Sequence, residues 1–191
     1  MTAIINASTS AGITQTGDNS GVLAIQSAGT TVATFNSSGV NAGIQVVSNA
    51  APAFSAYQSS SQSISSGTWT KVTCQTKEFD TNTNYDNTTN YRFTPTVAGY
   101  YQCSFGADLK GTTSNRLIGV FYKNGSWFKS GSGAFNGAAS TEFESTGSAL
   151  IYCNGSTDYV ELYANSSSGT GTVYASTGYI TYINGVMVRG A

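Results

Sequence analysis

The chain has 191 residues, which is enough for one domain of about 140 residues with an extension but too few for a second large domain. Only 9% of the residues are charged, and the formal net charge is −1. The chain therefore lacks the basic surface that binds the phosphates of nucleic acids or membranes, and neither is expected as a partner. Aromatic residues make up 12%, which gives the chain more apolar area than a disordered chain has.

The sequence near Met1 lacks the basic start and the apolar run of a secretory signal. No stretch of about 18 apolar residues occurs anywhere in the chain. We therefore expect synthesis in a cytoplasm without export through such a signal, and no insertion into a membrane.

Residues 1–50 differ from the rest in composition, because they contain no Tyr, Trp, Lys, Arg or Glu and consist mainly of small and polar residues. Short β-strands are predicted at residues 12–16, 21–27 and 30–36, with turn residues between them. These runs are too short and too weakly apolar to offset their conformational entropy alone. We expect residues 1–50 to fold against copies of themselves or against a docking surface. A flexible linker, which the Gly and Ser content also favours, is the alternative.

Residues 51–191 are predicted to form one antiparallel all-β sandwich, since strand-like runs alternate with turn residues and no helical period of useful length occurs. Asn-Gly dipeptides favour tight two-residue hairpin turns between antiparallel strands. These dipeptides begin at Asn124, Asn136, Asn154 and Asn184. Four of them in one domain strengthen the prediction of antiparallel pairing.

A β-hairpin is predicted in residues 84–105. In its second arm Tyr101, Cys103 and Phe105 alternate with polar residues, which indicates a strand with one buried face. Pro95 cannot donate a backbone hydrogen bond and marks either the end of the first arm or an edge position. A lone hairpin is marginally stable in water, so its buried face requires a second sheet.

The three cysteines, Cys74, Cys103 and Cys153, each lie in a strand-like run and are predicted to be buried thiols. A disulfide between two of them is the alternative. Histidine is absent, so neither a Ser-His-Asp nor a Cys-His catalytic arrangement can form, and a structural zinc site is not expected.

Glu142 and Glu144 are the candidate pair of catalytic carboxylates. They would share one strand face about 7 Å apart, which lies between the separations used by retaining and inverting glycosidases. We interpret them as solvated strand charges, and we expect no enzymatic activity and no catalytic residues.

Oxygen-bearing side chains alternate in one loop, as in a calcium site. They belong to Asp80, Asn82, Asn84 and Asp86. The EF-hand pattern requires Gly and Glu at positions that are Tyr85 and Tyr91 in this chain. A polar hairpin loop is therefore predicted, and neither a metal site nor a cofactor is assigned.

The same region resembles the C1q and tumour-necrosis-factor-like (TNF-like) jelly roll. The resemblance begins with Tyr85, Asp86, Thr89, Phe93, Gly99, Tyr100 and Tyr101, which are similar to its central strands. Further landmarks follow the family order at residues 53–56, 79–80, 123–125, 155–162 and 178–182. Together they cover residues 51–188. The resemblance implies an antiparallel jelly-roll sandwich whose subunits pack side by side in a homotrimer. Some members of the family bind calcium near the trimer axis, which implies no particular residues here.

Residues 1–50 resemble the strand and turn segments near the attachment ends of bacteriophage tail fibres. The two resemblances together imply a trimeric virion protein made in the cytoplasm of a host bacterium. Residues 1–50 would dock on another virion protein and trimerise, while a head of residues 51–191 would bind a host surface glycan. A capsid decoration or head-fibre protein is the first alternative. A secreted C1q-like lectin is the second, and it predicts a secretion signal and a collagen-like stalk, which this sequence lacks.

The surplus of aromatic residues suggests where the head makes contacts, because a two-sheet sandwich cannot bury both faces of its strands. The tyrosines predicted at the trimer interface are Tyr159, Tyr163, Tyr179 and Tyr182. Loops in residues 111–116, 127–137 and 166–171 are predicted to form the recognition surface. The residues predicted to contact the glycan are Asn115, Arg116, Trp127, Lys129 and Phe135.

Overall fold

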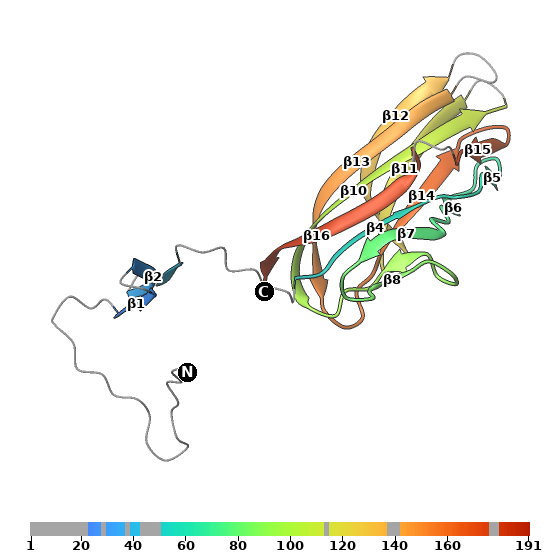
Figure 1. The fold of residues 1–191 in the computed structure, drawn as a ribbon. Helices are drawn as coiled ribbons and strands as arrows, with labels where there is room; N and C mark the ends of the chain where they lie inside the picture. Colours follow the sequence, from blue (N-terminus) through green and yellow to red (C-terminus); the bar gives the residue numbers. More distant parts are fainter. Residues whose placement is uncertain are drawn as a thin grey trace. The chain divides into compact units, whose positions relative to one another are not determined.

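The computed structural model describes residues 23–27, 30–36, 39–42, 51–112, 115–136, 142–175 and 180–191. The chain divides into two compact units, Met1–Asn49 and Ala50–Ala191. The described strands pair in an antiparallel manner in both units (Figure 1). No helix long and apolar enough to cross a bilayer occurs in the described part of the chain.

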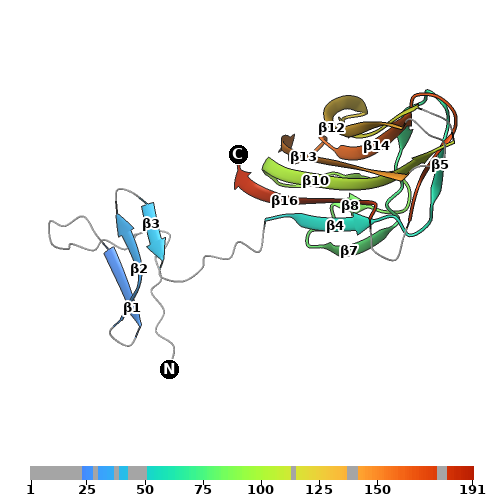
Figure 2. The same ribbon diagram turned by 90° about the horizontal axis from the view of Figure 1, so that it is seen from above.

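The first unit contains a three-stranded meander in the order β1-β2-β3, seen side by side in Figure 2. Its strands are β1 (Leu23–Ser27), β2 (Thr30–Asn36) and β3 (Gly39–Ala42). The strands predicted at residues 21–27 and 30–36 are confirmed, β3 was not predicted, and the run at residues 12–16 lies outside the described residues. The register aligns Leu23 with Phe35 and Phe35 with Val40.

The second unit is a sandwich of two sheets. The seven-stranded sheet contains β4 (Ala53–Tyr57), β5 (Gln62–Ile64), β7 (Thr76–Asp80), β10 (Ala98–Gly111), β13 (Glu142–Asn154), β15 (Gly171–Val173) and β16 (Tyr182–Gly190). The six-stranded sheet contains β6 (Thr70–Lys71), β8 (Tyr85–Asp86), β9 (Arg92–Phe93), β11 (Asn115–Lys123), β12 (Ser126–Asn136) and β14 (Val160–Ser166). The predicted all-β jelly-roll sandwich is therefore confirmed.

Aromatic rings from both sheets fill the space between them. The Phe93 ring stacks on Phe54 with centroids 4.3 Å apart and meets the edge of Tyr101 at 5.3 Å. Further along the core, Phe105 meets Phe121 at 4.8 Å in an edge contact. These contacts join the facing sheets, and burial of such rings is the main favourable contribution to the stability of the sandwich.

The hairpin predicted in residues 84–105 is wrong, although the buried face of its second arm is confirmed. Phe93 in β9 pairs with β8 and β14, whereas β10 pairs with β13, β15 and β16 in the other sheet. The chain therefore crosses between the sheets at residues 94–97, where Pro95 is buried. The Tyr101 hydroxyl donates a hydrogen bond of 2.6 Å to the Val97 carbonyl and fixes this crossing.

The Asn-Gly dipeptides have different roles. Asn124 and Gly125 form the predicted hairpin turn between β11 and β12 with φ values of 54° and 74°. The turn predicted at Asn184 is wrong, because this residue and Gly185 lie within β16. A Cβ atom at Gly185 would approach Phe54 Cε1 at 2.9 Å, so the glycine permits close packing against the ring.

Asp158 joins two turns at one end of the sandwich. Its carboxylate accepts hydrogen bonds from Asn124 Nδ2 at 2.8 Å and from the Asn154 backbone N–H at 3.1 Å. It also pairs with Lys123 Nζ at 3.0 Å. Two of the sequence landmarks, at residues 123–125 and 155–162, thus meet in one network. The Asn124 hydrogen bond, followed by Lys123 and Asn154, lowers the pKa of Asp158.

The beginning of β4 and the end of the chain lie at this same end of the sandwich. The Met187 backbone N–H donates to the Pro52 carbonyl at 2.9 Å, and the Ala191 backbone N–H donates to the Ala98 carbonyl at 3.1 Å. At the opposite end, Thr112 N–H donates to the Thr170 carbonyl at 3.0 Å. The two ends of the sandwich therefore differ in which loops they present.

All three cysteines are buried free thiols, as predicted. Burial raises the pKa of Cys74 to about 12 and also raises the pKa of Cys103. The pKa of Cys153 rises to about 11, chiefly through burial. These thiols are therefore uncharged near neutral pH and act as small core side chains.

Candidate functional site

The outer face of the seven-stranded sheet is the main candidate for an interaction surface, and we call it the β10 face. Large apolar side chains are exposed on it, although exposed positions on sheets are usually polar. They belong to Phe79, Tyr100, Leu150, Tyr152, Val186 and Val188. Among residues 51–191, the structure describes only two other exposed large hydrophobic side chains, Trp127 and Phe135.

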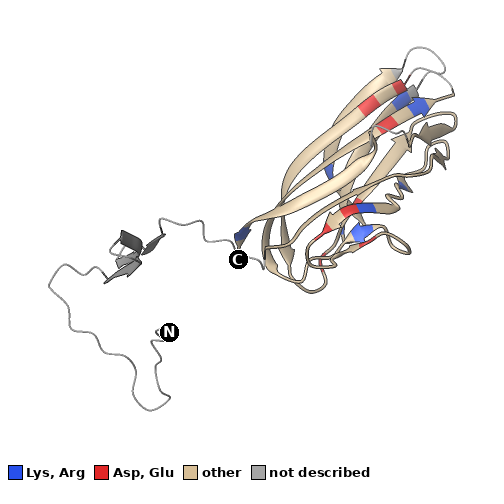
Figure 3. Ribbon diagram, in the orientation of Figure 1, with Lys and Arg blue, Asp and Glu red and all other residues tan. Residues whose placement is uncertain are grey.

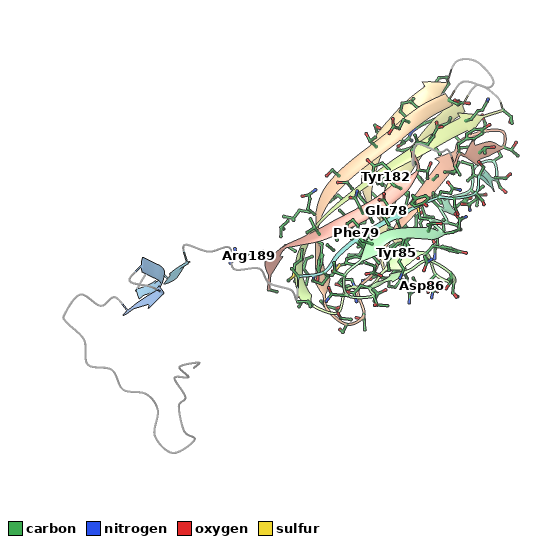
Figure 4. The ribbon with its side chains drawn as sticks, in the orientation of Figure 1. Glu78, Phe79, Tyr85, Asp86, Tyr182 and Arg189 are labelled. Atoms are coloured by element: carbon green, nitrogen blue, oxygen red, sulfur yellow. The ribbon has the colours of Figure 1, made fainter. Side chains whose placement is uncertain are left out.

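Strand register brings these residues together from distant parts of the sequence. Tyr100 lies opposite Tyr152, and their rings are 5.4 Å apart. Gln102 lies between Leu150 on β13 and Val186 on β16. Figure 4 labels Phe79, Tyr182 and Arg189, which lie on β7 and β16 of the same sheet. The β10 face is therefore assembled by pairing across five strands: β13, β10, β16, β4 and β7.

Two hollows indent the β10 face. One of ≈ 750 Å³ is lined by Tyr100, Leu150, Tyr152, Val188 and the chain end at 189–191. The other, of ≈ 370 Å³, is lined by residues of β4, β10 and β16 together with Phe79 of β7. Such hollows between exposed rings and aliphatic groups can receive the side chains of a protein partner.

The centre of the β10 face is uncharged. Figure 3 shows charged residues near the ends of β10, β13 and β16 and none along the middle of these strands. Arg189 lies at one end of the face. Four charged residues lie towards the other end: Asp108, Lys110, Glu142 and Glu144. The centre thus combines Leu150 and Val186 with uncharged polar side chains such as Gln102, and its charges lie at the margin, as is common in protein interfaces.

The predicted interface tyrosines do not share one face. Tyr182 lies on β16 of the seven-stranded sheet, opposite Gly106 of β10. Tyr163 lies on β14 of the six-stranded sheet, and Tyr159 directly precedes that strand. Tyr179 lies outside the described residues. The structure thus brings Tyr159 and Tyr163 together and separates them from Tyr182.

The predicted recognition residues are also divided. Arg116 and Phe135 are paired across β11 and β12, and Phe135 is 77% exposed. Trp127 lies at the other end of β12, beside the turn at residues 124–125. Lys129 lies between them, with Nζ 5.5 Å from the Phe128 ring. The side chain of Asn115 lies outside the described part. These residues do not form a single site.

The carboxylates considered for catalysis are at the surface. Glu142 and Glu144 are exposed on β13, and Lys110 Nζ pairs with Glu142 at 3.3 Å. Burial, followed by the charges of Glu142 and Glu144, raises the pKa of Asp108 on the neighbouring strand. Because both side chains are exposed, they remain solvated strand charges in our interpretation.

The oxygen-rich loop uses its carboxylates to hold the backbone. Asp80 accepts hydrogen bonds from the backbone N–H groups of Asn84 at 2.9 Å and Tyr85 at 3.0 Å. Asp86 accepts hydrogen bonds from the backbone N–H groups of residues 88–90, and these lower its pKa well below the usual range. Within the described ranges, no group of three or more His, Cys, Asp or Glu side chains is arranged to hold a metal ion.

Sequence reasoning missed the β10 face. Tyr100 and Tyr152 are separated by about fifty residues, and only the pairing of β10 with β13 places them side by side. The available signal was the occurrence of apolar residues at the outward positions of strands whose other face is core, as at Leu150 and Val186.

No protein-family model matches the chain, and no curated protein matches it. Solved structures do match. The globular domain of zebrafish complement 1qA protein is 19% identical over 74% of this chain and 99% of its own, with a TM-score of 0.53. Eiger TNF from S. frugiperda is 8% identical over 74% and 93%, with a TM-score of 0.57. Murine APRIL is 8% identical over 72% and 99%, with a TM-score of 0.55. The chain therefore shares the jelly-roll fold of the C1q and TNF-like domains.

Proposed function

We propose that this chain is a structural protein of a bacteriophage virion, a homotrimer whose C1q-like head recognises the host surface. It acts by noncovalent binding and has no enzymatic activity. The fold is compatible with this role, and residues 1–50 resemble the strand and turn segments near the attachment ends of bacteriophage tail fibres. Residues 1–50 attach the trimer to another virion protein.

The β10 face is the observation that supports self-association. Leu150 and Val186 are 55% and 46% exposed at its centre, and leaving such side chains in water is unfavourable. Specific interfaces bury about 800 Å² on each partner, which requires a surface that extends over several strands. A second copy of the chain suits a neutral face, because an uncharged surface gives no electrostatic preference for a basic or acidic partner.

The meander of the first unit supports the same assembly. Its three strands have only 5, 7 and 4 residues and few apolar side chains, which is little to offset their conformational entropy without a partner. A trimeric head raises the local concentration of three such meanders, so they can pack against one another or against the virion protein to which they attach.

The head would recognise the host through surfaces that the trimer leaves exposed. Arg116 and Phe135 form one such place, at the end of the sandwich opposite the beginning of β4. An exposed aromatic ring next to an arginine can stack on a sugar ring and donate hydrogen bonds to its hydroxyl groups. A host surface glycan is therefore the proposed ligand.

Mass measurement under native conditions tests the assembly, and electron microscopy of phage particles with the protein labelled tests the location. We expect the purified protein to contain three chains, and the label to lie at the tail of the phage. Label distributed over the capsid would indicate a decoration protein instead. A monomer, or a protein absent from phage particles, would overturn the proposal.

A further inference from the structure

The outer face of the six-stranded sheet carries a second group of aromatic residues, which we call the aromatic strip: Trp69, Tyr122, Tyr159 and Tyr163. The Tyr122 and Tyr163 rings stack with centroids 3.9 Å apart and planes inclined by 17°. The Trp69 ring lies 6.2 Å from Tyr122. All four side chains are half-buried, so the strip is a fixed, partly exposed platform.

The strip has unused hydrogen-bonding groups. In the part of the chain that the structure describes, the hydroxyl groups of Tyr122, Tyr159 and Tyr163 have no hydrogen-bond partner, and neither has Trp69 Nε1. Buried or half-buried phenol and indole groups usually find a partner. The strip therefore offers both ring faces and polar groups to a ligand.

A buried carboxylate lies beside the strip. Glu161 is directly opposite Tyr122 in the β11–β14 register and is only 2% exposed. Its Oε1 pairs with Lys71 Nζ at 2.5 Å, whereas its buried Oε2 has no hydrogen-bond partner. Glu161 and Tyr163 are two residues apart on β14 and therefore share a strand face, and burial, followed by the charge of Glu161, raises the pKa of Tyr163. Burying Glu161 Oε2 without a hydrogen-bond donor costs free energy, and a ligand that brings a donor would remove this cost.

Two cations lie beside the strip, Lys71 at the carboxylate and Arg92 at the Tyr159 ring. Lys71 Nζ donates a second hydrogen bond to the Asn90 carbonyl at 3.0 Å and is partly exposed. The Arg92 guanidinium lies 4.2 Å from the Tyr159 ring and, among the described residues, has no carboxylate within ion-pair distance. The strip thus combines hydrogen-bond donors with an acceptor, as a ligand with many hydroxyl groups requires.

We propose that the aromatic strip binds a glycan chain, with sugar rings lying against Trp69 and Tyr122 and a sugar hydroxyl donating to Glu161 Oε2 beside Lys71. This inference rests on the proposed recognition of a host glycan and assigns it to the outer face of the six-stranded sheet. That sheet lies on the opposite side of the sandwich from the β10 face, so a trimer formed through the β10 face would leave the strip accessible. A protein partner fits less well, because the rings are half-buried and expose little apolar area.

Binding of the full-length protein to an array of purified bacterial lipopolysaccharides, capsular polysaccharides and teichoic acids tests the site. We expect Trp69→Ala and Tyr122→Ala to weaken binding at least tenfold. Tyr163→Phe keeps the stacked ring and removes only the hydroxyl, so it should weaken binding severalfold without affecting folding. Tyr182→Phe likewise removes only a hydroxyl, but on β16 of the seven-stranded sheet, and should leave binding unchanged.

A second measurement does not depend on the stability of these variants. The chain has two tryptophans, so in Trp127→Phe the fluorescence reports on Trp69 alone. We expect the polysaccharide that binds on the array to change this fluorescence. Unchanged fluorescence, with Trp69→Ala binding like the parent protein, would overturn the assignment of the site but leave glycan recognition standing. A parent protein that binds nothing on the array would overturn both.

Discussion

A Cβ atom at Gly147 would approach Phe105 Cζ at 2.6 Å, so the Phe105 ring occupies the space that this glycine leaves open. Phe105 is 1% exposed and makes an edge contact with Phe121 of the opposite sheet. Gly119 and Gly131 approach the same ring in the same way. Three glycines on three strands therefore accommodate one core phenylalanine.

Substitution of this glycine should destabilise the sandwich. Gly147→Ala is expected to lower the free energy of unfolding by about 2 kcal/mol, because overpacking a filled core forces the ring or the backbone to shift. Urea unfolding measures the change. Gly133→Ala is the matched control, since a Cβ there would make an ordinary contact of 3.4 Å with Ile118 Cδ1. Equal losses in the two variants would contradict the explanation.

Leu150→Asp should break the trimer and leave the subunit folded. The side chain is 55% exposed in the single chain and lines the larger hollow of the β10 face, so a charge costs little there until another copy covers it. We expect native mass measurement to give mainly monomer and circular dichroism to be unchanged. Phe135→Asp on the six-stranded sheet should remain trimeric. A trimeric Leu150→Asp variant together with a monomeric Phe135→Asp variant would place the interface outside the β10 face.

Asp158 should make stability sensitive to acid. Because its hydrogen bonds and Lys123 lower its pKa in the folded state, its contribution is complete above the unfolded carboxyl pKa of about 3.9 and is lost as pH falls through the folded value. We expect Asp158→Asn to reduce the loss of unfolding free energy below about pH 4. Glu144→Gln removes an exposed carboxylate and should leave that slope unchanged. Denaturant unfolding at several pH values checks both.

The Lys71 and Glu161 pair should show non-additive effects. Lys71→Met leaves a buried carboxylate without a cation and is expected to cost about 2 kcal/mol, less than a fully buried pair because Lys71 is partly exposed. Adding Glu161→Leu removes that charge, so the double variant should recover much of the loss. Thermal unfolding of the two single variants and the double variant measures the coupling. Additive losses would show that the pair is not energetically coupled.

The sequence allowed the class of fold to be predicted, because strand periodicity is local. The alternation at Tyr101, Cys103 and Phe105 indicated the buried face of β10 correctly. Pairing is not local, so the sequence did not reveal that β9 and β10 belong to different sheets. Gly185 was interpreted as a turn residue because nothing near it in the sequence indicates the Phe54 ring that it accommodates.

The candidate surfaces depended even more on pairing. The outward position of Leu150 follows from local alternation, but its proximity to Val186 requires β10 to lie between β13 and β16. Of the tyrosines predicted at an interface, Tyr159 and Tyr163 lie together in the aromatic strip. Their separation from Tyr182 depends on which sheet each strand joins, and composition carries no information about that.

The hydrogen bonds of Pro52 with Met187 and of Ala98 with Ala191 have a practical consequence. A peptide fused after Ala191 would emerge beside the point where the backbone enters the sandwich. The opposite rim, near Thr112 and Thr170, would stay clear of the fusion. Affinity tags and fluorescent reporters attached after Ala191 should therefore leave cell adsorption measurable.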